Sequence, residues 1–192
     1  GLDGAVEEAG RNVSGGEATL REDLPEILAY ARSKNFAIRL YSNAYAIDDR
    51  IADAIARAGV LEVHVSVYSD RDEEHDAVTQ VPGSLQRTLA GIRRLRARGV
   101  RVLMKTPMMS IAPGARLRVQ ALAEQLGAAH TAGPTITPAE DGSLSTLDMH
   151  ASPEQLIADG GIEPWLPPAD ARERREKMLD GVSCGVCTSS VA

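Results

Sequence analysis

A carboxylate follows two adjacent glycines near the start of the chain, in the stretch Gly15-Gly16-Glu17. Glycine permits backbone angles that are closed to other residues, and it lets the chain pass close to a ligand. Glu17 holds a negative charge beside that bare backbone, which suits a ligand with an ammonium group. A phosphate cradle is the weaker interpretation, because neither G-x-G-x-x-G nor a P-loop lysine is present and an anion would meet Glu17 unfavourably.

Polar residues also follow several short apolar runs further along the chain. In parallel βα folds the ligand sits beyond the carboxyl ends of the strands, so these residues are the first candidates for a binding site. They are Ser14 to Glu17, Ser42 with Asn43, Ser66 with Tyr68, Lys105 with Thr106, and Thr135 with Thr137. We expect the five strand ends to form one pocket, although a turn or a helix cap explains any single Ser or Thr equally well.

The only two cysteines, Cys184 and Cys187, form a C-x-x-C pair close to Ala192. Such a pair is a poor disulfide framework and a fair half of a metal site. Two thiolates cannot complete a tetrathiolate cluster site, so we expect the other ligands beyond Ala192 and the pair itself to be unligated unless a partner chain contributes.

His75 and Asp76 are adjacent, and they could be taken for a general acid and base or, with His64, for metal ligands. Adjacent residues rarely point into one site, and no further ligand stands at metal spacing. A hydrogen bond that fixes the local loop is therefore the favoured role.

The elements that must position these residues alternate between short β-branched runs and helical patterns, which predicts repeated βα units and a parallel sheet. We expect strands near Arg11 and at 37–41, 61–66, 100–105 and 130–137, and helices at about 24–31, 51–58, 85–95 and 117–126. This α/β pattern fits either an open wound sheet or a sector of a (β/α) barrel. After Pro138 the pattern changes to a turn-rich connector, with a short helix opened by Ser152 and a charged helix at 170–179.

Composition narrows the classes of function. The formal net charge of −6 and a pI near 5.3 argue against a nucleic-acid partner, because phosphate contact needs a concentrated basic face. The basic run from Arg93 to Arg101 is better explained as a solvated helix face than as a docking patch. We expect no membrane partner and a cytoplasmic location, since the sequence shows neither a long apolar run nor signal-peptide features.

The segment Val13 to Arg21 resembles the strand-end motif of radical S-adenosylmethionine (SAM) enzymes, whose glutamate holds the amino group of the methionyl part of SAM. The proline that usually follows the glutamate is Ala18 here. Further segments resemble radical SAM proteins with a SPASM-type C-terminal region, and together they look most like peptide maturases. These segments are 75–79, 81–84, 89–92, 105–107, 136–138, 141–142 and 152–156.

The resemblance implies a partial (β/α) barrel of the radical SAM type, incomplete in this chain, at residues 1–139. A connector with short helices would follow at 140–182, and residues 183–192 would begin a SPASM-like region. There Cys184 would ligate an auxiliary iron-sulfur cluster, and Cys187 would be either an extra ligand or a bystander. Ser66 corresponds to a serine near the SAM ribose, and Arg87 corresponds to an arginine that pairs with the SAM carboxylate. The predicted cofactor-binding set is Gly15, Gly16, Glu17, Ser42, Asn43, Ser66, Arg87 and Lys105.

In an intact relative, a [4Fe-4S] cluster held by a C-x-x-x-C-x-x-C loop reduces SAM, and the resulting 5′-deoxyadenosyl radical abstracts hydrogen from the substrate. This loop is not in the sequence, so we expect the 192-residue chain to be inactive alone. The implied partners are a precursor peptide and an electron donor such as a flavodoxin or ferredoxin. Two alternatives stay open: a radical SAM enzyme of cofactor biosynthesis with a small-molecule substrate, and a noncatalytic βα domain that binds a peptide or nucleotide.

Overall fold

The computed structural model describes residues 10–136 and 145–160. The chain divides into two compact units, and all of these residues lie in the first unit, Gly1–Gly161. Three sequence predictions concern residues outside the described ranges: the helix at 170–179, the pocket residue Thr137, and metal ligation by Cys184 and Cys187.

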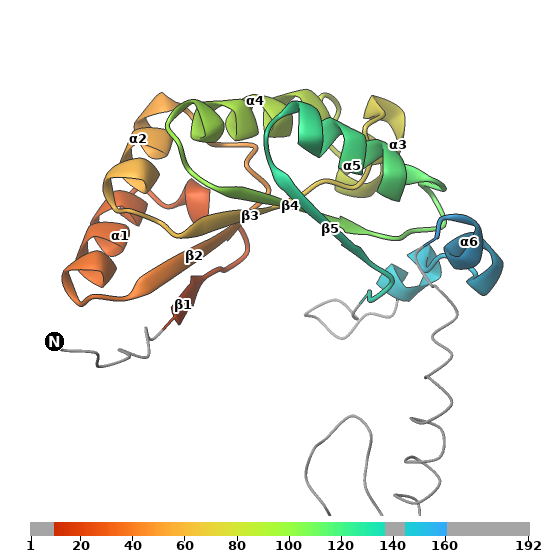
Figure 1. Cartoon of the computed structure of the whole chain (residues 1–192), viewed down its shortest axis with the longest axis horizontal. Helices are drawn as coiled ribbons and strands as arrows, with labels where there is room; N and C mark the ends of the chain where they lie inside the picture. The colour runs from red at the N-terminus through yellow and green to blue at the C-terminus, as the bar shows by residue number, and fades with distance from the viewer. Residues whose placement is uncertain (1–9, 137–144, 161–192) are drawn as a thin grey trace, which may run out of the picture. The chain divides into compact units, whose positions relative to one another are not determined.

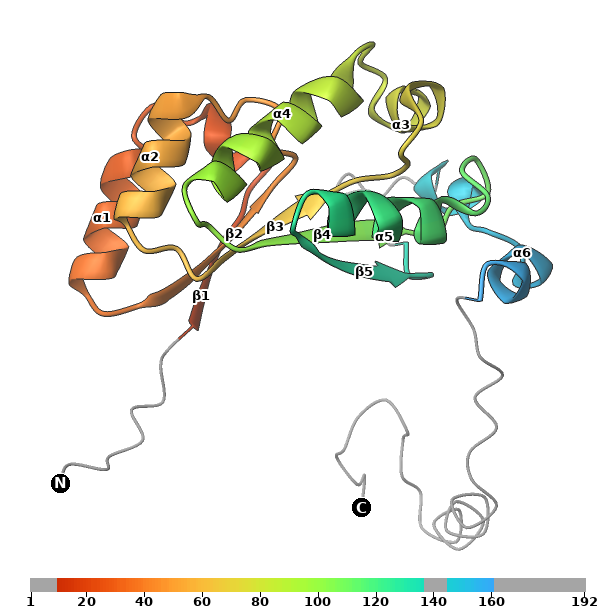
Figure 2. The same cartoon turned by 45° about the horizontal axis from the view of Figure 1, so that its top comes forward.

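The described residues contain one sheet of five parallel strands, and the strands are arranged in chain order. The strands are β1 (Gly10–Val13), β2 (Ala37–Ser42), β3 (Glu62–Ser66), β4 (Val102–Pro107) and β5 (Ala129–Gly133). A doubly wound sheet reverses its strand order at a switch point, whereas a (β/α) barrel adds each strand beside the last. The observed order, with the helices on one face of a twisted sheet, confirms the predicted α/β fold as a sector of a barrel (Figures 1 and 2).

Five longer helices cover the sheet, and three short helical segments flank them. The covering helices are α1 (Leu24–Ser33), α2 (Asp49–Arg57), α3 (Asp72–Thr79), α4 (Ser84–Ala97) and α5 (Ala115–Gln125). The short segments are η1 (Ala18–Leu20), η2 (Ser145–Met149) and α6 (Pro153–Ala158). Ser152 opens α6 as predicted, and it does so through a capping box with Gln155. No helix among these residues is long and apolar enough to cross a bilayer.

The structure departs from the sequence prediction at two elements. Helix α3 was not predicted, because its sequence is almost wholly polar and only His75 is buried. Strand β5 ends at Gly133 instead of continuing to Thr137, and the next residue, Pro134, has no N–H to donate to a strand partner.

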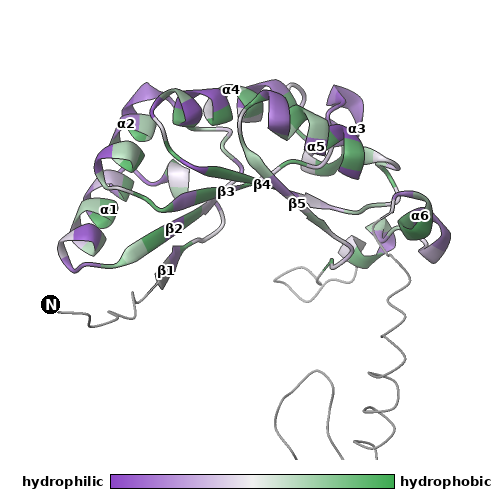
Figure 3. Ribbon diagram, in the orientation of Figure 1, coloured by the Kyte–Doolittle hydropathy of each residue, from purple (hydrophilic) through white to green (hydrophobic). Residues whose placement is uncertain are grey.

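The core lies between the sheet and the helices. Alternate strand residues face the helices and are fully buried, including Ile38, Leu40, Val63 and Val65. Their neighbours face away from the helices and include polar residues, so each strand mixes hydrophobic and hydrophilic segments (Figure 3). Parallel sheets are normally covered on both faces, and a polar uncovered face is what the interior of an open barrel sector requires.

The basic run on α4 is partly structural. Arg98 pairs with Asp49 (2.8 Å) and Asp53, which ties the end of α4 to α2. Arg94 donates to the carbonyl of Ile47 (3.1 Å). The run therefore fastens two helices together and is not simply a solvated helix face.

Helix α4 also packs closely against the loop after β2. A Cβ added at the buried residue Gly91 would collide with the backbone oxygen of Ala44. On the neighbouring turn, the Thr88 hydroxyl donates to the Asn43 carbonyl (2.9 Å). The absence of a side chain at Gly91 thus sets how near α4 comes to the loop that carries Asn43.

Gly91→Ala is expected to lower the free energy of unfolding by about 1–3 kcal/mol, because overpacking against backbone outweighs the gain in helix propensity. Chemical denaturation would measure the change. Gly133→Ala is the matched control, since a Cβ there meets nothing within 4 Å, and it should stay within about 0.5 kcal/mol of the parent. Equal stability of the Gly91→Ala variant and the parent would contradict the close approach.

Candidate functional site

Glu17 stands at the end of the loop that follows β1, and its side chain caps the short helix η1. The Oε1 atom accepts from the backbone N–H of Thr19 (3.0 Å) and from the Thr19 hydroxyl (2.6 Å). These contacts fix the carboxylate relative to its own loop.

The same carboxylate reaches across to the end of β2. Its Oε1 accepts from the Ser42 hydroxyl (2.8 Å), and its Oε2 accepts from the backbone N–H of Asn43 (2.7 Å). A carboxylate offers about four lone-pair sites over its two oxygens. Oε1 has three partners and Oε2 has one among the described residues, so Oε2 is the atom that can accept from a ligand.

The two glycines before Glu17 give space, not unusual backbone angles. Neither Gly15 nor Gly16 has a positive φ, so the loop does not use the left-handed backbone angles that glycine permits. A Cβ at either position would meet nothing within 4 Å. The loop beside the carboxylate is exposed and open, as a site for close ligand approach requires.

A pocket of about 360 Å³, here called the tip pocket, lies beside Asn43 at the end of β3. It is lined by Asn43, Tyr45, Ser66, Tyr68, His75, Thr79, Val81, Ser84 and Thr88. Aromatic rings and hydroxyls dominate this lining, and burial raises the pKa of the Tyr68 phenol. Through Asn43, whose N–H binds Glu17, the pocket adjoins the carboxylate.

Arg87 lies in the first turns of α4 and does not line the tip pocket. Its Nη1 donates to the Tyr45 hydroxyl (2.6 Å), and its guanidinium carbon lies 4.6 Å from the centre of the Tyr45 ring. Tyr45 does line the pocket, so the arginine is one side chain removed from it. Tyr45 was not predicted as a site residue, because this contact spans 42 residues and depends on how α4 packs on the β2 loop.

Lys105 borders a different pocket of about 370 Å³, here called the barrel pocket, on the uncovered face of the sheet. It is lined by Tyr41, Ser66, Lys105, Thr106, Pro107, Thr131, Ala132, Gly133 and Thr135. Ser66 lines both pockets. The strand ends, which were expected to form one pocket, therefore line two pockets that meet at Ser66. Lys105 lines one of them and Asn43 lines the other.

Asp76 fixes the start of α4, as the predicted loop-fixing role requires. Its Oδ1 accepts from the Ser84 hydroxyl (2.7 Å) and from the N–H groups of Ser84 (3.1 Å) and Leu85 (3.3 Å), while Oδ2 accepts from the Gly83 N–H. The Ser84 hydroxyl and these backbone donors hold the pKa of Asp76 below its usual range. Asp76 thus supplies the capping acceptor that α4 itself lacks.

His75 binds the same serine. The Ser84 hydroxyl donates to Asp76, so its oxygen accepts from Nδ1–H of His75 (3.0 Å). Burial lowers the pKa of His75, which keeps the ring neutral. His64 pairs instead with Glu62 (2.7 Å), and the described ranges contain no group of three His, Cys, Asp or Glu residues that could hold a metal.

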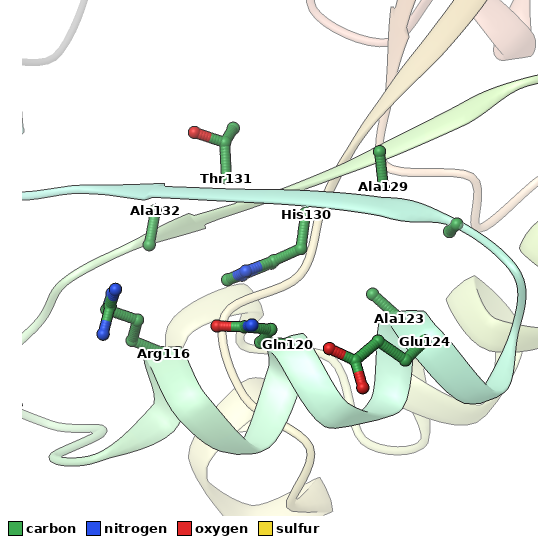
Figure 4. Close-up of a pocket in the computed structure, with 9 residues that line it drawn as sticks. Arg116, Gln120, Ala123, Glu124, Ala129, His130, Thr131 and Ala132 are labelled. Carbon is green, nitrogen blue, oxygen red and sulfur yellow. The ribbon is translucent and has the colours of Figure 1, made fainter.

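A further hollow, of about 500 Å³, lies between α5 and β5 and contains none of the predicted site residues. His130 and Ala132 point toward Arg116 and Gln120 of α5, and Thr131 points to the opposite side of the strand (Figure 4). Burial lowers the pKa of His130, whose Nε2 lies 3.1 Å from the Thr106 hydroxyl.

Comparison with known proteins identifies relatives of the chain. The profile of the Radical SAM superfamily matches residues 11–115, more than half of the chain. The chain is 35% identical over 89 residues to the Fe-coproporphyrin III synthase of Methanosarcina barkeri, covering 46% of this chain and 22% of that protein. It is 26% identical over 179 residues to the PqqA peptide cyclase of Xanthomonas axonopodis pv. citri, covering 86% of this chain and 48% of that protein. The chain thus spans less than half the length of these relatives.

Solved structures share the fold. Streptococcus suis SuiB bound to S-adenosylmethionine aligns with a TM-score of 0.63 at 11% identity, over 87% of this chain and 36% of that chain. A domain of pyruvate-formate lyase-activating enzyme from Bacteroides vulgatus aligns with a TM-score of 0.55 at 18% identity, over 79% of this chain and 95% of that chain. At these identities the likeness establishes the architecture alone.

Asp76→Asn is expected to lower the melting temperature at neutral pH, because an amide cannot accept from all four donors at the start of α4. A depressed carboxyl pKa in the folded state adds stability above the unfolded pKa of about 3.9, and that stability is lost as pH falls through the folded value. The gap in melting temperature between parent and variant should therefore narrow below about pH 4. Circular dichroism melts from pH 7 to 3 would measure it.

Glu73→Gln, an exposed change on the same helix, is the control and should shift the melting temperature little at any pH. A gap for Asp76→Asn that stays constant down to pH 3 would contradict the capping role.

Proposed function

Because this chain belongs to the radical SAM superfamily, we propose that it is the SAM-binding core of an enzyme that cleaves SAM reductively and uses the 5′-deoxyadenosyl radical to modify a ribosomally made peptide. The observation that carries the proposal is the Glu17 carboxylate at the ends of β1 and β2, with acceptor capacity left on Oε2. An ammonium group is the ligand that such an atom attracts most strongly.

The residues around the carboxylate fit a SAM molecule. The amino group of its methionyl part binds Oε2 of Glu17, beside the open backbone of Gly15 and Gly16. Ser42 and Asn43 hold the carboxylate in place, so they act on SAM through Glu17. Ser66, which lines the tip pocket, lies near the ribose.

Arg87 forms an ion pair with the SAM carboxylate and gives up its contact with Tyr45 to do so. The arginine is exposed and its contact with Tyr45 involves one hydrogen bond and the ring face, so a carboxylate can compete for it. A bound anion near the start of α4 would also meet the positive end of the helix dipole.

The [4Fe-4S] cluster of the family supplies the electron for SAM cleavage. The described residues contain no group suited to hold it, so they contribute SAM binding and the exclusion of water and not cluster ligation. Ligation of an auxiliary cluster by Cys184 and Cys187, an electron donor such as a flavodoxin or ferredoxin, and a cytoplasmic location belong to the proposal for the whole protein.

The extent of the similarity favours a peptide substrate. The match to a PqqA peptide cyclase extends over 86% of the chain, whereas the match to the Fe-coproporphyrin III synthase covers 46%. The second candidate is a small-molecule enzyme of cofactor biosynthesis, which the higher identity of that shorter match, 35%, supports. A noncatalytic βα domain that binds a peptide or nucleotide would show no preference for SAM.

Glu17→Gln is expected to weaken SAM binding by about tenfold or more, since an ionic hydrogen bond contributes about 1.5–3 kcal/mol. Saturation-transfer NMR with the 192-residue chain would measure binding even when it is weak. Binding of 5′-methylthioadenosine, which lacks the amino acid part, should change less than about twofold, and this separates the loss of one contact from the loss of the fold.

Glu22→Gln removes the same charge at an exposed position five residues away. This control should leave the affinities for SAM and for 5′-methylthioadenosine unchanged. If Glu17→Gln bound SAM as tightly as the parent, the proposed role of the carboxylate would be wrong.

A further inference from the structure

Three polar side chains form one row across the uncovered face of the sheet. Ser66 of β3 is the register partner of Lys105 of β4, which in turn is the register partner of Thr131 of β5. Register partners in a parallel sheet point to the same face. All three line the barrel pocket. The helices lie on one face of the sheet and leave the other face open (Figure 2).

The row carries one positive charge, and the described residues supply no counter-charge to it. The Lys105 ammonium lies 5.5 Å from the centre of the Tyr41 ring, and no Asp or Glu among residues 10–136 and 145–160 forms an ion pair with it. The acid further down this face, Glu62, is engaged by His64. The exposed ammonium is thus available to a ligand.

The other residues that line the barrel pocket are uncharged, and several of them carry hydroxyl groups. Ser66 and Thr131, the register partners of Lys105, each add a hydroxyl to the lining, and Pro107, Ala132 and Gly133 carry no charge. One ammonium flanked by hydroxyls matches a single negative charge with oxygen acceptors. A phosphate dianion normally requires more cations or the fork of an arginine, and neither lines this pocket.

We infer that the barrel pocket binds a carboxylate of the substrate, with Lys105 as the counter-charge and Ser66 and Thr131 as hydroxyl donors. This inference rests on the proposed function and adds a substrate class to it. The barrel pocket shares Ser66 with the tip pocket, so a carboxylate-bearing substrate held there lies next to bound SAM. Lys105, which the sequence assigned to the cofactor, selects the substrate instead.

Two sources of carboxylate fit this chemistry, an acidic peptide side chain and the propionate of a tetrapyrrole. The probes are therefore acetyl-Ala-Glu-Ala-amide, its Gln counterpart, and coproporphyrin III, each titrated into the ¹⁵N-labelled 192-residue chain. The Glu peptide should shift the amide signals of Ser66, Lys105 and Thr131 and should bind at least about fivefold more tightly than the Gln peptide, which is about 1 kcal/mol.

Lys105→Met should weaken binding of the acidic probes by at least about fivefold and should change the affinity for SAM by less than about twofold. Arg39→Met is the matched control. It removes one positive charge from an exposed residue on the same face, nearer the other end of the strands, and it should change the affinity neither for the acidic probes nor for SAM. A loss confined to coproporphyrin III would support the carboxylate site with a tetrapyrrole as its source.

Unchanged affinity of Lys105→Met for both acidic probes would overturn the inference, as would an equal loss of SAM binding, since Lys105 would then belong to the cofactor. Failure of the proposed function is separable from this. It would appear as SAM binding that does not respond to Glu17→Gln, whatever the acidic probes do.

Discussion

The site depends on one carboxylate that joins two strand ends. Glu17 follows β1 in the sequence, and it accepts from the hydroxyl and backbone donors at the end of β2 while also capping η1. The exposed residues Ser14, Gly15 and Gly16 have no apolar side chains to pack, so the hydrogen bonds of Glu17 are what link this loop to the end of β2. The hydrogen bonds orient the carboxylate as well, because they saturate Oε1 and leave Oε2 available. Both oxygen atoms of Glu17 therefore support the structure, and we propose that Oε2, which has one partner among the described residues, also binds the ligand.

A second polar centre, at the start of α4, shapes the other wall of the tip pocket. Asp76 and His75 both bind Ser84, and Gly91 lets α4 approach the loop that contains Asn43. The pocket is thus bounded by loops whose positions depend on hydrogen bonds and close backbone contact, above a core of aliphatic residues. Ser66, at the tip of the central strand, is the point where this pocket meets the polar interior of the barrel sector.

Much of this arrangement follows from the sequence by simple rules, and the rest depends on packing. Parallel strand ends share one edge, so Glu17, Ser42 and Asn43 could be placed together from their positions after apolar runs alone. Helix α3 could not be foreseen, since a polar helix capped onto its neighbour leaves no apolar stripe. The contact of Arg87 with Tyr45 depends on the distance between α4 and a loop. Lys105 was predicted to bind the cofactor, and the inference that it binds the substrate comes from the two adjoining pockets, which the sequence does not reveal.

The most direct test of the account is a crystal structure of the protein with SAM bound. We expect the SAM amino nitrogen within hydrogen-bonding distance of Oε2 of Glu17, with Oε1 still bound to Thr19 and Ser42 and with the adenosyl part beside Ser66. A SAM molecule bound away from the ends of β1 and β2, or a Glu17 side chain that makes no contact with the ligand, would contradict it.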